Sequence, residues 1–297
     1  MYGIHNFVSM MNPRLALLNG YYHGTLPLRW WLNHRRAVRG KMPITTLFYH
    51  RIADDEANPW TTSNVMFARQ IRWLQRNFEI ISLSEAQWRI RSGVNPRPAV
   101  CITFDDGYAA NCDTAIPLLI EHSIPCTYFV TTHNVLNGIP FAHDVRCGVT
   151  FPLNTVAQLR SMAREGIEIG CHSRTHPNFG QLHDRRRIFD EVVTAGEELQ
   201  QEIGKPVRYF AFPFGQKENL NADVFNMAYE AGYEGVCSAY GGYNVPGGDA
   251  FHIQRVHGDN DMVRLKNWAT IDPRKLNIVP FDYAEHAELA ETVGANS

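Results

Sequence analysis

The sequence of 297 residues has no apolar run of about 18 residues or more, the length that would indicate a transmembrane helix. We therefore predict no spanning segment. The first residues also lack the charged-then-apolar pattern of a secretory signal, because Asn12, Pro13 and Arg14 interrupt it. These absences favour a cytoplasmic location, and contact with a membrane surface is an additional hypothesis raised by the N-terminal segment.

Paired cysteines and an excess of charge are absent as well. No C-x-x-C pair occurs among the six cysteines, which favours reduced, buried thiols over a disulfide framework. The formal net charge is −2, which gives no argument for a nucleic-acid partner. We find no internal repeat, no low-complexity segment and no glycine-rich dinucleotide loop. The sequence does not indicate an oligomeric state.

The composition, with 44% hydrophobic and 20% charged residues, supports a sizeable core. We divide the chain into an N-terminal extension (1–42), a main domain (43–261) and a C-terminal tail (262–297). The extension holds the segment Leu28-Arg29-Trp30-Trp31-Leu32, followed by several basic residues. Such a stretch either packs its tryptophans on the main domain, which we favour, or lies on an anionic membrane surface or a partner.

The main domain alternates short apolar strand patterns with helical patterns. Strands are expected at 44–49, 80–83, 100–104, 126–130, 168–171 and 209–212, near Val236, and at 253–256. Helices are expected at 109–121, 153–166, 184–203 and 222–231, among others, with an insertion loop at 133–153. About seven such units favour a (β/α) barrel with a parallel sheet, and an open doubly wound sheet is the alternative.

Polar side chains gather where the predicted strands end. His50 follows the first strand, Asp105 and Asp106 the third, His172 the fifth, and Pro213 with Gly215 the sixth. The carboxyl ends of barrel strands share one face, and that face holds the active site. The positions of these residues therefore predict a single site.

Two clusters carry the chemistry. In Thr103-Phe104-Asp105-Asp106-Gly107, one of two adjacent carboxylates can bind a cation while the other accepts a proton, although Asp-Gly is also a common turn dipeptide. In His172-Ser173-Arg174-Thr175-His176-Pro177, histidines at i and i+4 on one side of a helical turn can bind one metal. Two histidines and one carboxylate leave coordination positions open for water and substrate, as catalytic metal sites do. Cys171 is not expected to be a ligand, because its side chain should point opposite to that of His172.

These clusters, together with Phe210-Ala211-Phe212-Pro213-Phe214-Gly215, Phe48–Ile52 and Ser123–Val130, resemble the polysaccharide deacetylase (NodB-homology) family over roughly residues 44–260. The resemblance implies a distorted (β/α)₇ barrel. It implies that Asp105 is the catalytic base and that Asp106, His172 and His176 hold a divalent metal, with Zn²⁺ expected. It also places Tyr108, Pro213, Phe214 and Gly215 at the substrate pocket.

The sequence departs from the family pattern in two places. Many members carry an arginine where this chain has Ala211, and many have a late Leu-x-His motif that has no clear equivalent here. These departures resemble the branch of envelope and exopolysaccharide deacetylases that includes enzymes acting on β-1,6-linked N-acetylglucosamine polymers. In that branch Arg255 would replace the missing arginine, and a structural salt bridge is the other interpretation of this residue.

Two further histidines have open roles. His50 is expected in the active site, with a supporting position behind the pocket as the alternative. His143, beside Asp144 in the insertion loop, either reaches the substrate or forms a capping pair. The acid that protonates the leaving amine is not identified.

The predicted function is metal-dependent removal of an acyl group from an N-acetylated amino sugar. Asp105 would take a proton from the attacking water. A backbone N–H near Phe214 or Tyr108 would help the metal to stabilise the oxyanion. One alternative is an amidohydrolase of a small amide or cyclic imide, and another is an inactive carbohydrate-binding relative. A non-haem iron oxygenase shares the ligand types but would not need Asp105 beside the ligands.

Overall fold

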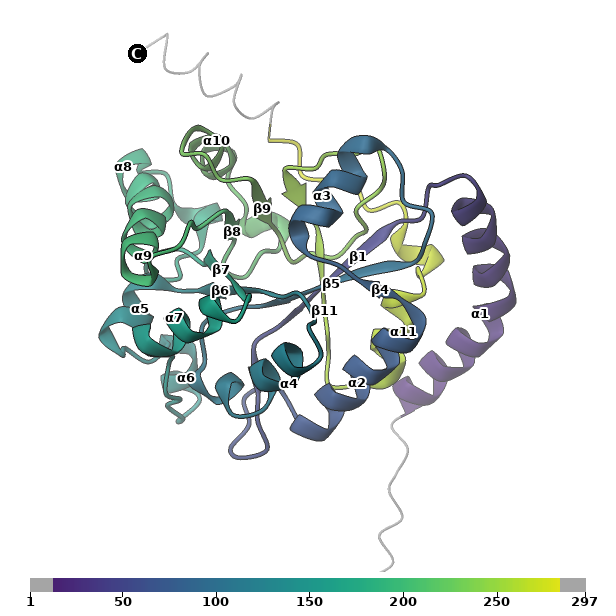
Figure 1. Cartoon of the computed structure of the whole chain (residues 1–297), viewed down its shortest axis with the longest axis horizontal. Helices are drawn as coiled ribbons and strands as arrows, with labels where there is room; N and C mark the ends of the chain where they lie inside the picture. Colours follow the sequence, from purple (N-terminus) through teal and green to yellow (C-terminus); the bar gives the residue numbers. More distant parts are fainter. Residues whose placement is uncertain (1–12, 284–297) are drawn as a thin grey trace, which may run out of the picture.

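The computed structural model describes residues 13–283 (Figure 1). Its main sheet is parallel, and its strands follow the order β10-β9-β8-β7-β6-β5-β1-β11, with β4 pairing beside the start of β5. The strands are β1 (Ile44–Tyr49), β4 (Glu79–Ile80), β5 (Ala99–Phe104), β6 (Thr127–Val130), β7 (Glu168–Cys171), β8 (Tyr209–Ala211), β9 (Gly235–Cys237), β10 (His252–Ile253) and β11 (Arg255–His257). A second, two-stranded sheet pairs β2 (Arg51–Ile52) with β3 (Thr61–Thr62).

The two edges of the main sheet are consecutive pieces of chain. β10 pairs with β9, β11 pairs with β1, and only Gln254 separates β10 from β11. The sheet therefore curls into a nearly closed barrel, as predicted, and the open doubly wound alternative was wrong.

Side chains alternate across the barrel wall because successive residues of a strand point to opposite faces. On β5, Val100, Ile102 and Phe104 belong to the large outer core beneath the helices, whereas Cys101 belongs to a separate inner cluster. The residues in phase with Cys101 are Thr103 and, just past the strand, Asp105. This alternation directs Asp105 toward the barrel axis.

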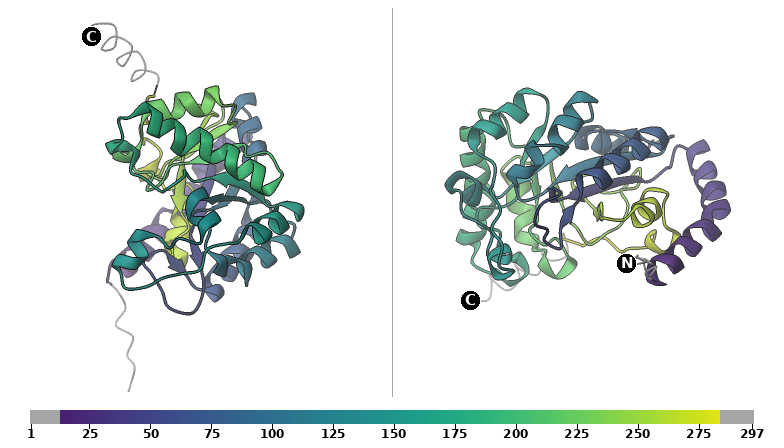
Figure 2. Two further views of the ribbon diagram at one scale, coloured as in Figure 1. Left: turned by 90° about the vertical axis from the view of Figure 1, so that its left-hand side faces the viewer. Right: turned by 90° about the horizontal axis from the view of Figure 1, so that it is seen from below.

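Helices surround the barrel, as Figures 1 and 2 show. They are α1 (Pro13–Val38), α2 (Asn64–Asn77), α3 (Leu83–Ser92), α4 (Ala115–Glu121), α5 (Thr132–Asn137), α6 (Ala142–Arg146), α7 (Val156–Arg164), α8 (Arg185–Phe189), α9 (Ala195–Ile203), α10 (Ala222–Glu230) and α11 (Met262–Ala269). Short 3₁₀ turns span Ala109–Cys112, Phe179–Gln181, Lys217–Asn219 and Pro273–Lys275. All six cysteines lie in the described range and are free.

Helix α3 closes the amino end of the barrel. Ser82 caps its start by accepting a hydrogen bond from the Glu85 N–H, and Gly93 ends it with a φ of 71°. Leu83, Ala86 and Ile90 join the inner apolar cluster of the barrel. The opposite, carboxyl end therefore remains the end at which a site can open.

Several elements differ from the expectations. The segment 133–153, expected as a loop, contains most of α5 and all of α6, and the helix expected at 109–121 is divided into a 3₁₀ turn and α4. The helix expected at 184–203 is continuous but contains a π-helical turn, Asp190–Thr194, between α8 and α9. Leu83, expected in a strand, begins α3, because Ser82 provides the cap.

Helix α1, in the predicted extension, lies along the outside of the molecule beside α11 (Figure 2). It contacts the body through buried Tyr22 and Arg29, whereas Trp30 and Trp31 are exposed. The extension thus packs on the main domain, but not through its tryptophans. Among residues 13–283, no helix has both the length and the apolar character required to cross a bilayer. The division of the chain at residues 43 and 261 stays a prediction.

Candidate metal centre and active site

The carboxyl end of the barrel contains a cavity of about 320 Å³. Its walls come from loops that follow several strands, as expected for the functional face of a barrel. The lining residues are Phe48, His50, Trp60, Asp105, Asp106, His143, His172, His176, Phe212, Phe214, Gln216, Asn219 and Ala239. The structure therefore brings the two predicted aspartates and the two predicted metal-binding histidines to one place.

Asp105 is paired with Arg255. The guanidinium donates two hydrogen bonds, from Nη1 to Oδ1 at 2.6 Å and from Nη2 to Oδ2 at 2.9 Å, and it also donates to Thr103 Oγ1 and the Ser238 carbonyl. Burial opposes ionisation of Asp105, but the charge of Arg255 and the other charges nearby outweigh it and lower the pKa of the carboxyl. Arg255 thus holds Asp105 ionised and in one orientation.

Asp106 turns in the opposite direction from Asp105. Its φ of 76° is in the left-handed region, which aspartate tolerates better than most residues. Gly107 follows with a φ of 94°, and a Cβ at that position would approach Val135 Cγ2 to 2.9 Å. Burial opposes ionisation of Asp106, and the imidazoles around it outweigh that effect and lower its pKa. Because of this turn the two adjacent carboxylates point in different directions, so each can have a different role.

His172 follows β7 and is almost completely buried. Its Nδ1 lies 2.8 Å from the Ala211 carbonyl, which can only accept, so Nδ1 carries the proton and Nε2 has a free lone pair. Nε2 lies 3.6 Å from Asp106 Oδ1. Burial lowers the pKa of His172 to about 4, which keeps the ring in the neutral form that binds metals.

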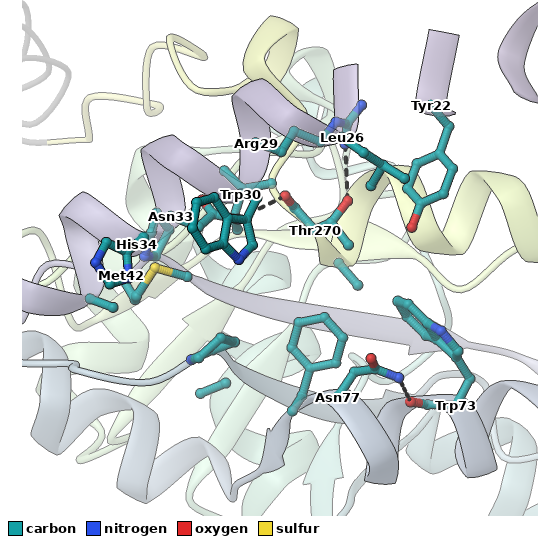
Figure 3. A pocket seen from close by; sticks show the side chains of 17 residues that line it. Tyr22, Leu26, Arg29, Trp30, Asn33, His34, Met42, Trp73, Asn77 and Thr270 are labelled. Atoms are coloured by element: carbon teal, nitrogen blue, oxygen red, sulfur yellow. Dashed lines mark hydrogen bonds between the residues drawn. The ribbon is translucent and has the colours of Figure 1, made fainter. Parts of the chain in front are cut away.

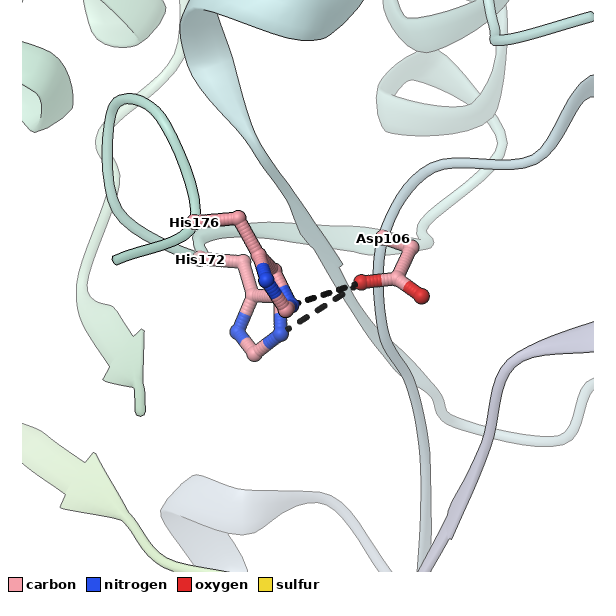
Figure 4. Close-up of side chains that lie close together, drawn as sticks. All are labelled: Asp106, His172 and His176. Atoms are coloured by element: carbon pink, nitrogen blue, oxygen red, sulfur yellow. Dashed lines mark ion pairs between the residues drawn. The ribbon is translucent and has the colours of Figure 1, made fainter. Parts of the chain in front are cut away.

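His176 reaches the same point from a loop rather than from the helical turn expected for i and i+4 histidines. Ser173 and His176 both have positive φ values, 67° and 62°. The loop is held because the Ser173 hydroxyl accepts a hydrogen bond from the His176 N–H at 3.0 Å. His176 Nε2 lies 3.4 Å from Asp106 Oδ1 (Figure 4).

A buried carboxylate supports the same loop from behind. Glu191, on the π-helical turn, accepts hydrogen bonds from the N–H groups of Arg174 and Thr175 at 2.9 and 2.8 Å, and from the Thr175 hydroxyl. The extra residue of a π-helical turn shifts the side chains that follow it, and such turns are frequent at functional sites. Glu191 therefore fixes the backbone between the two histidines.

The geometry of Asp106, His172 and His176 fits a divalent metal. Within the described residues, Asp106 Oδ1 is buried without a hydrogen-bond partner, and the ligand atoms of the three residues lie within 4.8 Å of one another. Bonds of about 2.1 Å at tetrahedral angles would separate two ligand atoms by about 3.4 Å, close to the two Nε2–Oδ1 distances. A buried carboxylate oxygen without a partner, facing the Nε2 atoms of two imidazoles, is what a cation site requires.

The other predicted site residues divide into two groups. His50 and Phe214 line the cavity, and His50 Nδ1 has no partner among the described residues. Tyr108, Pro213 and Gly215 do not line it. The Tyr108 hydroxyl donates to buried Asp144 at 2.7 Å, and Gly215, with a φ of 64°, lies so close to Ala239 that a Cβ would not fit. These residues shape the wall, and their contact with substrate stays a prediction.

Sequence reasoning missed the rim of the cavity. Trp60, between β2 and β3, packs its ring 5.2 Å from that of His50. Gln216 and Asn219 follow the Pro213–Gly215 turn and are joined by a hydrogen bond from the Gln216 N–H. His143 was singled out, and its Nε2 lies 3.2 Å from the Tyr108 hydroxyl. Trp60 lies outside the strand-end pattern, so only its proximity to the motif containing His50 could have indicated it.

Comparison with known proteins supports the predicted family. The model of the polysaccharide deacetylase family matches residues 92–236, a range that contains both aspartates and both histidines. This part of the chain matches a polysaccharide deacetylase domain. The resemblance inferred from sequence is thereby confirmed, and the predicted class, hydrolases of carbon–nitrogen bonds outside peptides, is that of the N-deacetylases of this family.

Two curated relatives show how far the similarity extends. A putative polysaccharide deacetylase of Bacillus subtilis, YxkH, is 24% identical over 65% of this chain, and the match covers 63% of that relative. A poly-β-1,6-N-acetyl-D-glucosamine N-deacetylase of Staphylococcus aureus is 23% identical over 80% of this chain and 81% of its own length.

Solved structures support the fold. The Streptococcus pyogenes deacetylase PplD, solved in complex with acetate, superposes with a TM-score of 0.64 at 19% identity, over 78% of this chain and 99% of that one. IcaB from Ammonifex degensii gives a TM-score of 0.63 at 22% identity, over 77% and 97% of the two chains. The barrel fold of this chain is thus shared with known deacetylases.

Proposed function

We propose that this protein is a metal-dependent N-deacetylase that acts on an amino-sugar polymer or glycan precursor. The observation that carries the proposal is the convergence, in one cavity, of the Asp106–His172–His176 cluster with the Asp105–Arg255 ion pair. The name of the Staphylococcus aureus relative supports N-acetylglucosamine polymers as the substrate class.

Asp106, His172 and His176 would hold the metal, and zinc is the expected ion. A divalent metal bound there would lower the pKa of a water molecule and polarise the amide carbonyl. Asp105 accepts the proton of the attacking water. Although Arg255 occupies one side of each carboxylate oxygen, each oxygen has a second lone pair. The bidentate contact therefore orients the base without blocking it.

The leaving amine needs a proton. Outside the ligand set, His50 and His143 are the two imidazoles that line the cavity, and histidine is the side chain that most readily exchanges protons near neutral pH. His143 already contacts the Tyr108 hydroxyl, whereas His50 Nδ1 is unpartnered within the described chain. His50 is therefore the better candidate for direct contact with the substrate.

The test combines metal analysis with a panel of substrates. We expect the purified protein to contain one divalent metal and to release acetate from N-acetylglucosamine oligomers. Asp105→Asn should abolish release while the metal content is unchanged, and Asp113→Asn, at an exposed position, should behave as the parent protein does. Full activity of Asp105→Asn would refute the assignment of the base.

The rival functions predict different outcomes of the same panel. Hydrolysis of small amides or cyclic imides without acetate release would favour an amidohydrolase. Retained metal and saccharide binding without any hydrolysis would favour an inactive carbohydrate-binding relative. The cytoplasmic location stays a prediction, which cell fractionation can check.

A further inference from the structure

Helix α1 is attached to the body mainly by polar contacts, although the apolar side chains Tyr22, Leu26 and Trp30 also lie on that side. Packed helices of soluble proteins normally direct the apolar stripe inward. In α1 the inward contacts are largely polar: Arg29 donates to the Asn267 side chain and carbonyl, Tyr21 donates to Asp272, and Asn33 donates to the Thr270 carbonyl. Hydrogen bonds to α11 and the chain just after it therefore anchor the helix.

The outward face of α1 is mainly apolar. Leu17, Leu28, Trp31 and Val38 are 75%, 50%, 47% and 76% exposed. They are spaced by eleven, three and seven residues, and with 3.6 residues per turn these spacings keep all four on one side of the helix. Trp30, which is 72% exposed, lies nearer the side that faces the body and lines the cleft there. We call Leu17, Leu28, Trp31 and Val38 the outer face.

A cleft beneath α1 shows that the helix stands off from the barrel. The cleft has a volume of about 440 Å³, and Figure 3 shows Trp30 of α1 and Trp73 of α2 among its lining residues. Because the anchoring contacts are concentrated on Arg29 and its neighbours, the core of the barrel does not require the outer face to be apolar. The packing of α1 on the barrel therefore does not explain the exposed apolar side chains.

The charged side chains of α1 and of the residues just after it are all basic. Helix α1 contains no acidic residue, and the first acidic residue of the whole sequence is Asp54. Arg35 is exposed on the same side of the helix as Leu17, eighteen residues or five turns further along, and its guanidinium lies 4.7 Å from the Trp31 ring centre. Arg39 and Lys41 follow the helix. Tryptophan and arginine beside an apolar stripe are typical of helices that lie in the headgroup region of anionic bilayers.

We propose that α1 docks the protein onto the surface of an anionic lipid bilayer, with the outer face inserted among the acyl chains and Arg35 at the phosphates. The helix lies parallel to the membrane. It is about 39 Å long at 1.5 Å per residue, so it offers a long line of contact while its inner face remains attached to α11. This proposal does not depend on the proposed deacetylase activity.

Vesicle flotation with the full-length protein tests the proposal. We expect binding to vesicles of phosphatidylcholine mixed with phosphatidylglycerol, little binding to phosphatidylcholine alone, and weaker binding at high salt. Trp31→Ala combined with Val38→Ser should reduce binding at least about ten-fold. Arg35→Gln should reduce it about five-fold, the equivalent of about 1 kcal/mol for one cation near the surface.

Helix α3 offers matched controls. Trp88 and Arg91 are exposed there, so Trp88→Ala and Arg91→Gln should leave vesicle binding unchanged. Acetate release from soluble oligomers should be the same in all these variants, which separates this proposal from the proposed function. The proposal is overturned if no vesicles are bound or if the α3 variants lose as much binding as the α1 variants. It is also overturned if light scattering shows that the outer face joins two copies of the chain and the dimer does not bind vesicles.

Discussion

The guanidinium of Arg255 and the carboxylate of Asp105 are joined by two parallel hydrogen bonds between residues that are 150 positions apart in the sequence. Arg255 is fully buried, so the charge of each partner is balanced mainly by the other. Removing one member of a buried pair costs about 3–5 kcal/mol, because an uncompensated charge remains.

Arg255→Gln should therefore lower the free energy of unfolding by about 3–5 kcal/mol, measured by urea denaturation. The double variant with Asp105→Asn should be more stable than Arg255→Gln alone, because no buried charge is then unpaired. If the two single effects simply add, the two residues are not coupled in the way that the geometry indicates.

Glu191 offers a test of metal-site positioning away from the ligands. In Glu191→Gln, either the side-chain NH₂ group faces the N–H groups of Arg174 and Thr175, so that donors oppose donors, or the loop shifts. We expect metal affinity to fall about 10–100-fold, measured by competition with a chelating dye. Glu197→Gln, an exposed carboxylate on α9, is the control. Unchanged affinity in Glu191→Gln would mean that the loop is held by Ser173 alone.

The pH dependence of stability should include a share from His252. This ring is buried and its Nε2 lies 2.9 Å from the Ser238 hydroxyl; burial lowers its pKa to about 4. Because the folded-state pKa is below the unfolded value of about 6.5, the neutral ring contributes its full stability above pH 6.5, and this stability is lost as the pH falls toward 4.

His252→Gln should accordingly remove on the order of 3 kcal/mol from the difference in unfolding free energy between pH 7 and pH 4. Denaturant titrations at several pH values measure this difference. His122→Gln, at an exposed position, should leave the profile unchanged. A profile that is identical in His252→Gln and the parent protein would contradict the assignment.

Trp60 and Phe214 stand half exposed at the cavity, where flat apolar rings can pack against the faces of sugar rings. Trp60→Ala should raise KM about ten-fold for N-acetylglucosamine oligomers and leave kcat nearly unchanged, because such packing contributes about equally to substrate and transition state. Trp88→Ala is the matched control. A loss confined to kcat would instead place Trp60 in the chemical step.

Much of this site was predictable because it follows strand ends. The strands at 44–49 and 99–104 are short, mainly apolar segments, and 168–171 is shorter and less apolar; each leads directly to His50, Asp105 or His172. Glu191 was not predictable, since its role depends on a π-helical turn that resembles an ordinary amphipathic helix in sequence. The role of Arg255 could be inferred only by resemblance, because its contact with Asp105 depends on the register of β11 beside β1.

The orientation of the outer face of α1 could not be predicted from the sequence either. Tryptophans are usually buried, so packing on the main domain was the favoured expectation for Trp30 and Trp31. The spacing of Leu17, Leu28, Trp31 and Val38 defines one side of a helix but does not say which side faces the protein. That depends on the hydrogen bonds made by Arg29 and Asn33, whose partners lie more than 200 residues away.

Strand β11, which completes the barrel by pairing with β1, links folding to catalysis. β1, near the start of the described chain, finds its second neighbour only in β11, so this pairing carries the largest loop-closure entropy in the sheet and is expected to form late. Arg255 belongs to that strand. A nascent or truncated chain that ends before residue 255 has the metal ligands but leaves Asp105 without its buried partner. Maturation of the base and completion of the barrel are therefore one event.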